Sequence, residues 1–540
     1  MPLWRPGPPQ RHTGPQAPIG SVLDTALAER PDAPAIDAAS GVWTYAELDE
    51  QARRAAGALW SLGVRPGDRV AACLPNDLDI VAAFHGAVRI GAIWAGIGEA
   101  LAEAEQRNLF DLCAPTVVLA GDHCALHAPE CVRPDRWSDL LTRTDDAPPV
   151  DVDLDSPAGI AFTSGTSGIP KAVVHSHRNL LLPGATLVVS RGWGPDLRKG
   201  DSFPLTILNL MVLSTLLTAQ AGGCAVVMNR RDLDGVAEWI TTRKVTVWNG
   251  APAQLFDLAR RPDLDLGSLR EVWSGGGDTP DSLRRAFAET HGLVPRVTYG
   301  LTEAPTVVSI DPAGDDWRPG TSGRVLPQYD VAAYDDDGHR LPHGELGELK
   351  LAGTGEGPWA HTWTPMLGYW ENGRIRPTGS GPVPTGDIGT VDGEGWLTVL
   401  DRKKLVIIRG GANVYPLEVE RVLATHPDIT KAAVYPIPDD RLGQRVAAVV
   451  ESDRPEPDFD AITALCRREL ASYKIPELWT RVDALPVNAM GKIQRAGLAE
   501  FVAAHRATEH RSVTEHRNVT EHRNVTEHRN VTEHRNAGRE

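Results

Sequence analysis

Amphipathic helical stretches alternate with short apolar strands from about residue 21 onward, and this alternation limits the folds open to the chain. The periodicity predicts helices over 45–62 and 80–90, and strands over 69–74 and 116–120. Strands separated by helices form βαβ units with parallel pairing. We therefore predict an α/β fold in which helices flank parallel sheets.

The segment Thr163-Ser-Gly-Thr-Ser-Gly-Ile-Pro-Lys171 directly follows an apolar strand-like run, 158–162. Glycines let the backbone approach an anion closely, hydroxyl groups donate to its oxygens, and a lysine supplies positive charge. A Walker loop is excluded because its glycines and lysine are spaced differently. The segment predicts a phosphate-binding loop, with a flexible Ser/Gly turn as the alternative. Its candidate phosphate-binding residues are Thr163, Ser164, Gly165, Thr166, Ser167, Gly168 and Lys171.

The formal net charge of −16 argues against a nucleic-acid surface. An anionic substrate must then be met by a few local cations, and Lys171, Arg402 and Lys492 are the candidates. The six cysteines form no C-x-x-C pair and are interpreted as reduced thiols of a cytoplasmic protein. The uncharged span 203–229 is long enough to cross a bilayer, but polar residues and a Gly-Gly pair interrupt it. We predict a buried helix followed by a buried strand there, and no membrane span.

The phosphate-loop segment resembles that of the adenylate-forming superfamily, which includes acyl-CoA synthetases and other AMP-dependent acid-thiol ligases, adenylation domains of peptide synthetases, and beetle luciferases. The resemblance covers about residues 21–505, and further motifs follow in the expected order. These motifs are Thr44-Tyr-Ala-Glu-Leu48, Ser274-Gly-Gly-Gly-Asp278, Tyr299-Gly-Leu-Thr-Glu303, Thr385-Gly-Asp387, Asp401-Arg-Lys-Lys404, the stretch Gly410-Gly-Ala-Asn-Val-Tyr-Pro-Leu-Glu-Val-Glu420, and Gly491-Lys492.

The resemblance implies a large N-terminal domain with parallel sheets and a small mobile α/β C-terminal domain. We place the large domain at 21–400 and the small domain at 401–505, after a disordered lead-in over 1–20. A low-complexity tail follows at 506–540, where Val-Thr-Glu-His-Arg-Asn repeats with a period of six. The tail contains glycosylation-like triplets and repeated histidines, but a solvated disordered tail is the preferred interpretation.

The reaction implied by the resemblance joins a carboxylate to the α-phosphate of ATP, giving an acyl-adenylate and pyrophosphate. Lys171 would hold the β- and γ-phosphates, Thr302 would contact the α-phosphate, and Glu303 would bind Mg²⁺. Lys492 would reach the carboxylate and the α-phosphate and stabilise the pentavalent state. Its neighbours depart from the family pattern, because Val487 and Met490 replace the usual basic and hydroxyl residues.

The same resemblance assigns the rest of the nucleotide site. Asp387 would accept hydrogen bonds from both ribose hydroxyls, and Arg402 would also contact the ribose. Tyr299 offers a ring for stacking on the adenine, next to Gly300. The backbone along the adenine would be that of Gly275, Gly276 and Gly277, followed by Asp278. Without the resemblance, a turn aspartate and a glycine loop would be the plainer interpretations.

A second half-reaction is implied in which the small domain rotates and a thiol attacks the adenylate. Lys404 falls at the hinge position of the family. Gly410, Gly411 and Gly443 match the loop that shapes a tunnel for pantetheine. CoA is the expected co-substrate, although a carrier-protein phosphopantetheine is an alternative.

The acid-binding region departs from the family, because no histidine follows the Pro-Leu stretch in 203–209. Candidate pocket residues are Asn209, Trp248, Asn249 and Ala304. Trp248 would shorten the pocket and favour a small or aryl acid, and a core tryptophan is an equally good account.

Three functional classes remain open. The first is an ATP- and Mg²⁺-dependent ligase that joins a carboxylic acid to CoA. The second passes the adenylate to an amine, or activates an unusual oxyanion such as nitrite, in a biosynthetic pathway. The third is a non-catalytic nucleotide-binding relic.

Overall fold

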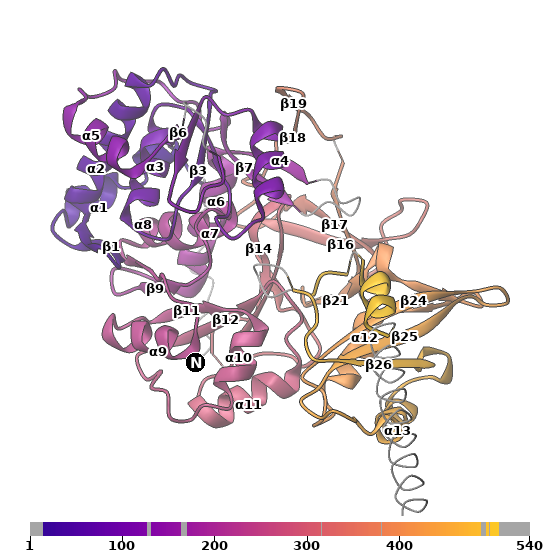
Figure 1. Cartoon of the computed structure of the whole chain (residues 1–540). Coiled ribbons are helices and arrows are strands. Elements are labelled where there is room, and N and C mark those ends of the chain that lie inside the picture. The colour runs from indigo at the N-terminus through magenta and orange to yellow at the C-terminus, as the bar shows by residue number, and fades with distance from the viewer. Residues whose placement is uncertain are drawn as a thin grey trace, which may run out of the picture. The chain divides into compact units, whose positions relative to one another are not determined.

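The computed structural model describes residues 14–126, 131–163, 170–314, 316–379, 381–487, 493–495 and 497–506. The chain divides into two compact units, of which the first runs to Lys403 and the second begins at Lys404. Both units mix helices and strands (Figure 1). The predicted fold class, an α/β protein with a large and a small domain, is confirmed.

An eight-stranded sheet forms the first layer of the large unit, in the order β19-β18-β8-β7-β4-β3-β5-β6. Its strands β3 to β7 pair in parallel, whereas β8, β18 and β19 are antiparallel to their neighbours. The strands are β3 Arg69–Cys73, β4 Ile93–Gly96, β5 Val117–Ala120, β6 Cys131–Val132, β7 Pro157–Thr163, β8 Lys171–Ser176, β18 Gly368–Glu371 and β19 Arg374–Arg376.

Helices cover this sheet, and most begin at a sequence signal that can be read directly. In α2, Thr44 is the N-cap and forms a reciprocal capping box with Glu47. The first motif shared with the adenylate-forming superfamily is therefore a helix start. The predicted helices and strands near 45–62, 69–74, 80–90 and 116–120 are confirmed. The helices are α1 Asp24–Glu29, α2 Tyr45–Ser61, α3 Leu78–Arg89, α4 Glu103–Cys113, α5 Pro134–Arg143 and α6 His177–Arg191.

A nine-stranded sheet forms the second layer, in the order β15-β14-β13-β12-β11-β9-β10-β1-β2. Six of these strands run parallel, from β1 through β10, β9, β11 and β12 to β13. Their carboxyl ends therefore meet at one edge, where ligands of parallel α/β sheets bind. The strands are β1 Pro34–Ala38, β2 Gly41–Thr44, β9 Arg198–Asp201, β10 Cys224–Val227, β11 Val247–Gly250, β12 Glu271–Gly275, β13 Arg296–Leu301, β14 Ala304–Ile310 and β15 Arg324–Val325; the helices α9 Leu233–Thr242, α10 Pro252–Leu258 and α11 Asp281–His291 follow β10, β11 and β12.

The uncharged span 203–229 is interior, as predicted. It forms α7 Leu208–Met211, a π-helical turn Val212–Leu216, α8 Leu217–Ala221 and then the buried strand β10. Within the part of the chain that the structure describes, no helix is both long and apolar enough to span a membrane.

A four-stranded antiparallel sheet completes the large unit, in the order β16-β17-β20-β21. The strands are β16 Tyr329–Tyr334, β17 Gly347–Gly353, β20 Val383–Val391 and β21 Leu397–Arg402. A 3₁₀ turn, Lys403–Leu405, follows β21 and crosses the boundary between the units.

The second unit is a small sheet flanked by helices, which include the stretch 498–506. Strands β23, β22, β25 and β24 are adjacent in that order, and β26 pairs in parallel with β25. The elements are β22 Ile407–Arg409, β23 Ala412–Val414, α12 Pro416–Leu423, β24 Lys431–Asp439, β25 Gly443–Glu451, α13 Phe459–Glu469, a 3₁₀ turn Ser472–Lys474 and β26 Leu478–Val482.

The predicted disordered lead-in over 1–20 extends too far. A 3₁₀ turn covers Ile19–Ser21, and the Ile19 side chain is fully buried. The backbone N–H of Ile19 donates to Nδ1 of the buried His177. One apolar side chain and one hydrogen bond to the core therefore order a segment that its composition had assigned to disorder. Residues 1–13 and the repeat tail from 507 onward lie outside the described residues.

Candidate nucleotide and catalytic site

The tip of the β13–β14 hairpin presents Thr302 and Glu303. Leu301 pairs with Ala304, so these two residues form the turn. The turn requires Gly300, because a Cβ at that position would lie 1.6 Å from the Thr306 carbonyl oxygen. The Tyr-Gly-Leu-Thr-Glu motif thus forms a tight hairpin at the carboxyl end of β13. Its glycine lets the two strands approach closely at Thr306, and its Thr-Glu pair forms the turn.

Lys171 and Glu303 both contact Tyr369, a residue that the sequence motifs did not identify. The Lys171 Nζ atom lies 5.2 Å from the centre of the Tyr369 ring. The Tyr369 hydroxyl donates to Glu303 Oε1 at 3.5 Å. Burial, followed by the nearby Glu303 carboxylate, raises the pKa of Tyr369 to about 12, so its hydroxyl remains a donor at neutral pH.

His175 holds the other side of the Thr302–Glu303 turn. Its Nε2 atom lies 2.8 Å from the Thr302 carbonyl oxygen. Burial lowers the pKa of His175 to about 4, so the ring is neutral at neutral pH. A carbonyl can only accept, and the neutral ring therefore carries its proton on Nε2. His175 was not predicted as a site residue, because a histidine in an apolar strand is ordinarily a core residue.

The predicted phosphate loop connects β7 to β8. Thr163 pairs with Lys171 in the antiparallel register of these strands, so the two residues flank the connection. Ser164, Gly165, Thr166, Ser167 and Gly168 lie outside the described residues, as does Lys492. Their predicted roles stay predictions.

Asp387 is joined to two other predicted nucleotide-binding residues. The Tyr299 hydroxyl donates to Asp387 Oδ2 at 2.5 Å, and Arg402 Nε lies 2.7 Å from Asp387 Oδ1. Asp387 is buried, and its backbone N–H donates to Thr385 Oγ1. Burial, together with the Asp387 carboxylate, raises the pKa of Tyr299 well above its usual value. Tyr299 therefore anchors Asp387 through its hydroxyl, a contact that the predicted stacking role does not include.

The glycine run after β12 lies at the same sheet edge. Gly275 pairs with Thr298, one residue before Tyr299. A Cβ on Gly275 would lie 2.2 Å from Thr298 Oγ1, and Gly276 has a φ of 83°. These two positions require glycine, whereas Gly277 and Asp278 simply follow in the loop. The structure thus brings the Gly-rich segment beside the Tyr299 strand.

The acid-pocket candidates separate into two groups. Asn249 is buried on β11, where its cross-strand partners are Asp201 of β9 and Trp273 of β12. Ala304 is buried at the start of β14, beside the turn that contains Glu303. The Oδ1 atom of Asn209, in α7, is buried and has no hydrogen-bond partner in the described part of the molecule. These three remain candidates for the pocket.

Trp248 points to the opposite face of β11 from Asn249 and packs with the buried side chains under α9, α10 and α11. This burial is what the core interpretation of Trp248 expects. Its suggested role in shortening the acid pocket stays a prediction.

Asn76 shapes the unusual segment after β9. Its amide Nδ2 donates to the Phe203 and Met228 carbonyls at 2.8 and 3.1 Å, and its Oδ1 accepts from the Leu205 N–H at 2.8 Å. Phe203 also packs with Leu210 and Ala251 at the end of β11. Sequence reasoning missed Asn76, and its local signal is no more than a polar residue in the loop after the strand β3.

The second unit holds the predicted hinge and tunnel residues. Lys404 is its first residue, within the 3₁₀ turn. Gly410, Gly411 and Gly443 all have positive φ angles, of 57°, 85° and 75°. The Gly410 N–H donates to the Leu442 carbonyl, and Arg409 pairs with Gly443, so the three glycines form one cluster.

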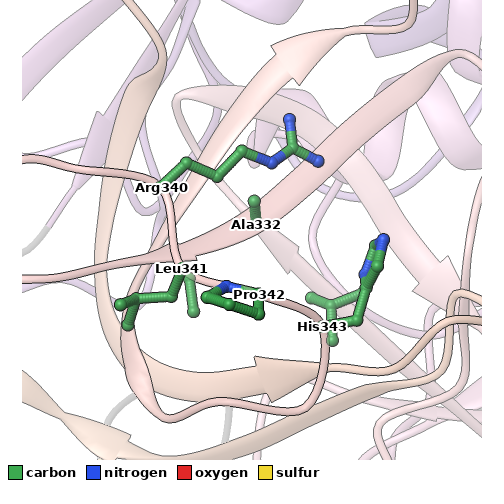
Figure 2. A pocket seen from close by; sticks show the side chains of 7 residues that line it. Ala332, Arg340, Leu341, Pro342 and His343 are labelled. Carbon is green, nitrogen blue, oxygen red and sulfur yellow. The ribbon is translucent and has the colours of Figure 1, made fainter.

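A cavity of about 370 Å³ lies on the four-stranded sheet of the large unit (Figure 2). It is lined by Ala332, Ala333, Arg340, Leu341, Pro342, His343 and Val391. None of the predicted site residues lines this cavity, and its Arg340 is held by a bidentate ion pair with Asp330. It is a surface hollow separate from the predicted nucleotide site.

Comparison with known proteins identifies the family of the chain. Residues 23–370 match the family model of AMP-binding enzymes, and residues 418–492 match that of the AMP-binding enzyme C-terminal domain. A feruloyl-CoA synthase of an Amycolatopsis species is 33% identical over 86% of this chain and 94% of its own length.

Solved structures give the same result. ATP-bound MatB from Rhodopseudomonas palustris has a TM-score of 0.79 and 27% identity, over 89% of this chain and 98% of its own. An amide bond synthetase from Marinactinospora thermotolerans has a TM-score of 0.75 and 29% identity, over 90% of this chain and 100% of its own. The motifs, the fold and both family models agree, and the chain belongs to the AMP-binding enzyme family.

Proposed function

We propose that the protein is an ATP-dependent ligase that activates a carboxylic acid as an acyl-adenylate, releases pyrophosphate, and transfers the acyl group to the thiol of CoA. One observation carries the proposal. Tyr299, on strand β13, donates its hydroxyl hydrogen bond to the Asp387 carboxylate. The turn that follows this strand carries Glu303, which accepts a hydrogen bond from Tyr369, and the Tyr369 ring lies beside Lys171. A sugar-binding carboxylate and a phosphate-binding group are thereby connected through a single strand.

Asp387 is the group that binds the ribose in this proposal. An ionised carboxylate has about four acceptor positions. Tyr299 and Arg402 each occupy one of them, on different oxygens. These contacts fix the direction in which the carboxylate faces, and we assign Asp387 to the two ribose hydroxyls on that basis.

The polyphosphate lies at Lys171 and at the loop that it flanks. Thr302 contacts the α-phosphate, and Glu303 is the Mg²⁺ ligand. The donor set fits Mg²⁺, which binds through one or two carboxylates together with substrate phosphates. When bound, the ion would neutralise charge that develops on the leaving pyrophosphate. His175 contacts the backbone of the Thr302–Glu303 turn and Tyr369 contacts the Glu303 carboxylate, and these contacts hold the turn in place.

The C-terminal residues complete the reaction. Lys492 donates to the carboxylate and the α-phosphate during adenylation. For transfer to the thiol, rotation at Lys404 brings the Gly410, Gly411 and Gly443 cluster to the adenylate, where small residues leave room for pantetheine. The small domain is thus used in two orientations, one for each half-reaction.

An amine is the second candidate acceptor. This candidate is favoured by the similarity over 90% of the chain to an amide bond synthetase. The first half-reaction is the same in both cases, because an acyl-adenylate is attacked by either nucleophile. The identity of the acceptor therefore depends on the second step and on the small domain.

ATP–pyrophosphate exchange with a panel of aliphatic and aryl acids, and with nitrite, tests the proposal. We expect exchange that depends on one class of acid, followed by a thioester when CoA is added, identified by its mass. Parallel reactions with a pantetheinylated carrier protein and with amines assign the acceptor. Nucleotide binding without exchange for any acid or for nitrite would contradict the proposal and favour a non-catalytic relic.

A further inference from the structure

The β18–β19 hairpin lies at the edge of the eight-stranded sheet, and two of its residues are arginines. Glu371 pairs with Arg374 across a two-residue turn, Asn372-Gly373, in which both φ angles are positive, at 51° and 76°. This is the geometry of a type I′ turn, which gives a tight and well-defined hairpin. Strand β18 in turn pairs with β8, the strand that begins at Lys171.

One face of the hairpin is apolar and anchored. Trp370 and Ile375 are paired and belong to the core beneath the sheet, and the guanidinium carbon of Arg69 lies 5.1 Å from the Trp370 ring centre. Because side chains alternate along a strand, Tyr369, Glu371, Arg374 and Arg376 all share the opposite face. The hairpin is therefore held rigidly with its charged face in a fixed direction.

That charged face is the face of Lys171. Tyr369 pairs with Val173, and paired residues of neighbouring strands lie on the same face of the sheet. Along β8, Lys171 and His175 share this face with Val173, because alternate residues of a strand point to the same side. Continuing the register by two residues sets Glu371 opposite Lys171. The turn Asn372-Gly373 thus lies at the same end of the sheet as Lys171 and Thr163, the residues that flank the predicted phosphate loop.

Arg376 lies beside the same tyrosine as Lys171. Its guanidinium carbon is 5.7 Å from the Tyr369 ring centre, compared with 5.2 Å for Lys171 Nζ. Glu371 holds Arg376 in a bidentate ion pair, with contacts of 2.6 and 2.9 Å. The face therefore carries three cations and one carboxylate, in a chain whose net charge is −16.

We propose that Arg374 and Arg376 bind the β- and γ-phosphates of ATP, and the pyrophosphate product, together with Lys171. The proposal rests on the proposed function, since it concerns the polyphosphate of the same nucleotide. Guanidinium groups bind phosphate oxygens through paired hydrogen bonds, and the ion pair with Glu371 keeps Arg376 oriented until a stronger anion arrives. The competing explanation is that these arginines only protect an exposed sheet edge from pairing with other chains.

Isothermal titration calorimetry with ATP, AMP and pyrophosphate distinguishes the two explanations. We expect the Arg374→Ala/Arg376→Ala variant to lose about tenfold or more in affinity for ATP and pyrophosphate, with AMP affinity unchanged, because AMP lacks the two distal phosphates. Glu371→Gln should raise ATP affinity by about twofold to threefold, since the competing carboxylate is removed. Arg340→Ala is the matched control, because Arg340 forms a similar bidentate pair with Asp330 on another sheet.

Each outcome has a distinct meaning. Unchanged ATP affinity in the double variant would overturn the assignment, and so would an equal loss for ATP and AMP, which would indicate a structural role. Wild-type protein that binds neither nucleotide would instead contradict the proposed function itself. Arg376→Lys and Arg374→Lys provide a second check, since they keep the charge and should recover part of the ATP affinity.

Discussion

Tyr369 contacts Lys171 and Glu303 through different parts of one side chain. Its ring is near the ammonium group, whereas its hydroxyl makes a long contact of 3.5 Å with the carboxylate. An aromatic face attracts a nearby cation by about 1 to 2 kcal/mol, and a hydrogen bond of this length is weak. We expect Tyr369→Phe to keep ATP–pyrophosphate exchange within about threefold and Tyr369→Leu to lower it by about tenfold.

The measurement is the initial rate of exchange at saturating acid, with the unfolding midpoint of both variants as a control for folding. If Tyr369→Phe lost as much activity as Tyr369→Leu, the hydroxyl contact with Glu303 would be the important one. The ring would then have no separate effect on Lys171.

Single buried histidines also make the free energy of unfolding depend on pH. Burial lowers the pKa of His85 to about 3, compared with 6.5 when the chain is unfolded. Between these values the unfolded chain binds a proton that the folded chain does not, so the free energy of unfolding falls as the pH drops below 6.5. The expected loss per histidine is about 1.4 kcal/mol per pH unit. His175 and His177, whose pKa values are about 4, act in the same direction.

We expect His85→Leu to remove one of these contributions. Urea unfolding at pH 7.5, 6.0 and 5.0, followed by tryptophan fluorescence, should show the variant gaining on the wild-type protein by about 1 kcal/mol for each pH unit below 6.5. Parallel pH profiles for the two proteins would show that His85 titrates normally. The substitution is compatible with the site, because the His85 Nε2 atom is buried and lacks a hydrogen-bond partner in the described part of the fold.

At the scale of elements, strand β9 shows where sequence reasoning fails. Arg198-Lys-Gly-Asp201 is polar and carries no strand signal, yet it lies between β10 and β11 in the centre of the nine-stranded sheet. Lys199 and Asp201 are fully buried on one face, with Nζ 3.4 Å from Oδ2. Ser214 from the π-helical turn also donates to Asp201. Pairing between distant segments, which no local pattern records, stabilises this strand.

A double-mutant cycle tests how this pair contributes. We expect Lys199→Met to cost about 3 to 5 kcal/mol, because it leaves a buried carboxylate without its cation, and the added Asp201→Leu to recover part of that loss. Burial already raises the pKa of Asp201 despite its lysine. The exposed pair Arg230–Asp232 is the control, where neutralising substitutions should leave the unfolding midpoint nearly unchanged. Urea unfolding measures all variants, and additive losses would rule out coupling.

The elements that were predicted correctly have strong local signals. The capping box at Thr44, the apolar strand before Thr163 and the uncharged span 203–229 each specify their structure from neighbouring residues. The contacts of Tyr369 and His175 with the Thr302–Glu303 turn were missed, because they connect segments far apart in the chain. Local patterns thus predict elements and motif positions, whereas side-chain contacts around the motifs require the fold.

At the scale of the whole molecule, the division between Lys403 and Lys404 separates two sets of residues. The contacts among Tyr299, Asp387 and Arg402, which we propose to bind the nucleotide, lie within the first unit. The glycine cluster that we propose to face the thiol belongs to the second. If each half-reaction depends on one of these two sets of residues, a substitution in one set should impair one half-reaction and spare the other.

Lys492→Ala is the variant that separates them. We expect it to lower adenylation, measured as acid-dependent ATP–pyrophosphate exchange, by about 10²- to 10³-fold, because a donor to the transition state is removed. Thioester formation from supplied acyl-adenylate and CoA should remain near the wild-type rate, since we propose that Lys492 acts only in adenylation. Gly411→Val is the complementary variant, because its backbone has a φ of 85° and a β-branched residue there disturbs the proposed thiol cluster.

The two variants are measured in both assays on the same preparations. Gly411→Val should keep exchange within about twofold and slow thioester formation from the adenylate, the reverse of the pattern expected for Lys492→Ala. Equal loss of both half-reactions in Lys492→Ala would contradict the use of the small domain in two orientations. Loss of exchange in Gly411→Val would instead show that the second unit contributes its glycine cluster to adenylation, so that one arrangement of the units serves both steps.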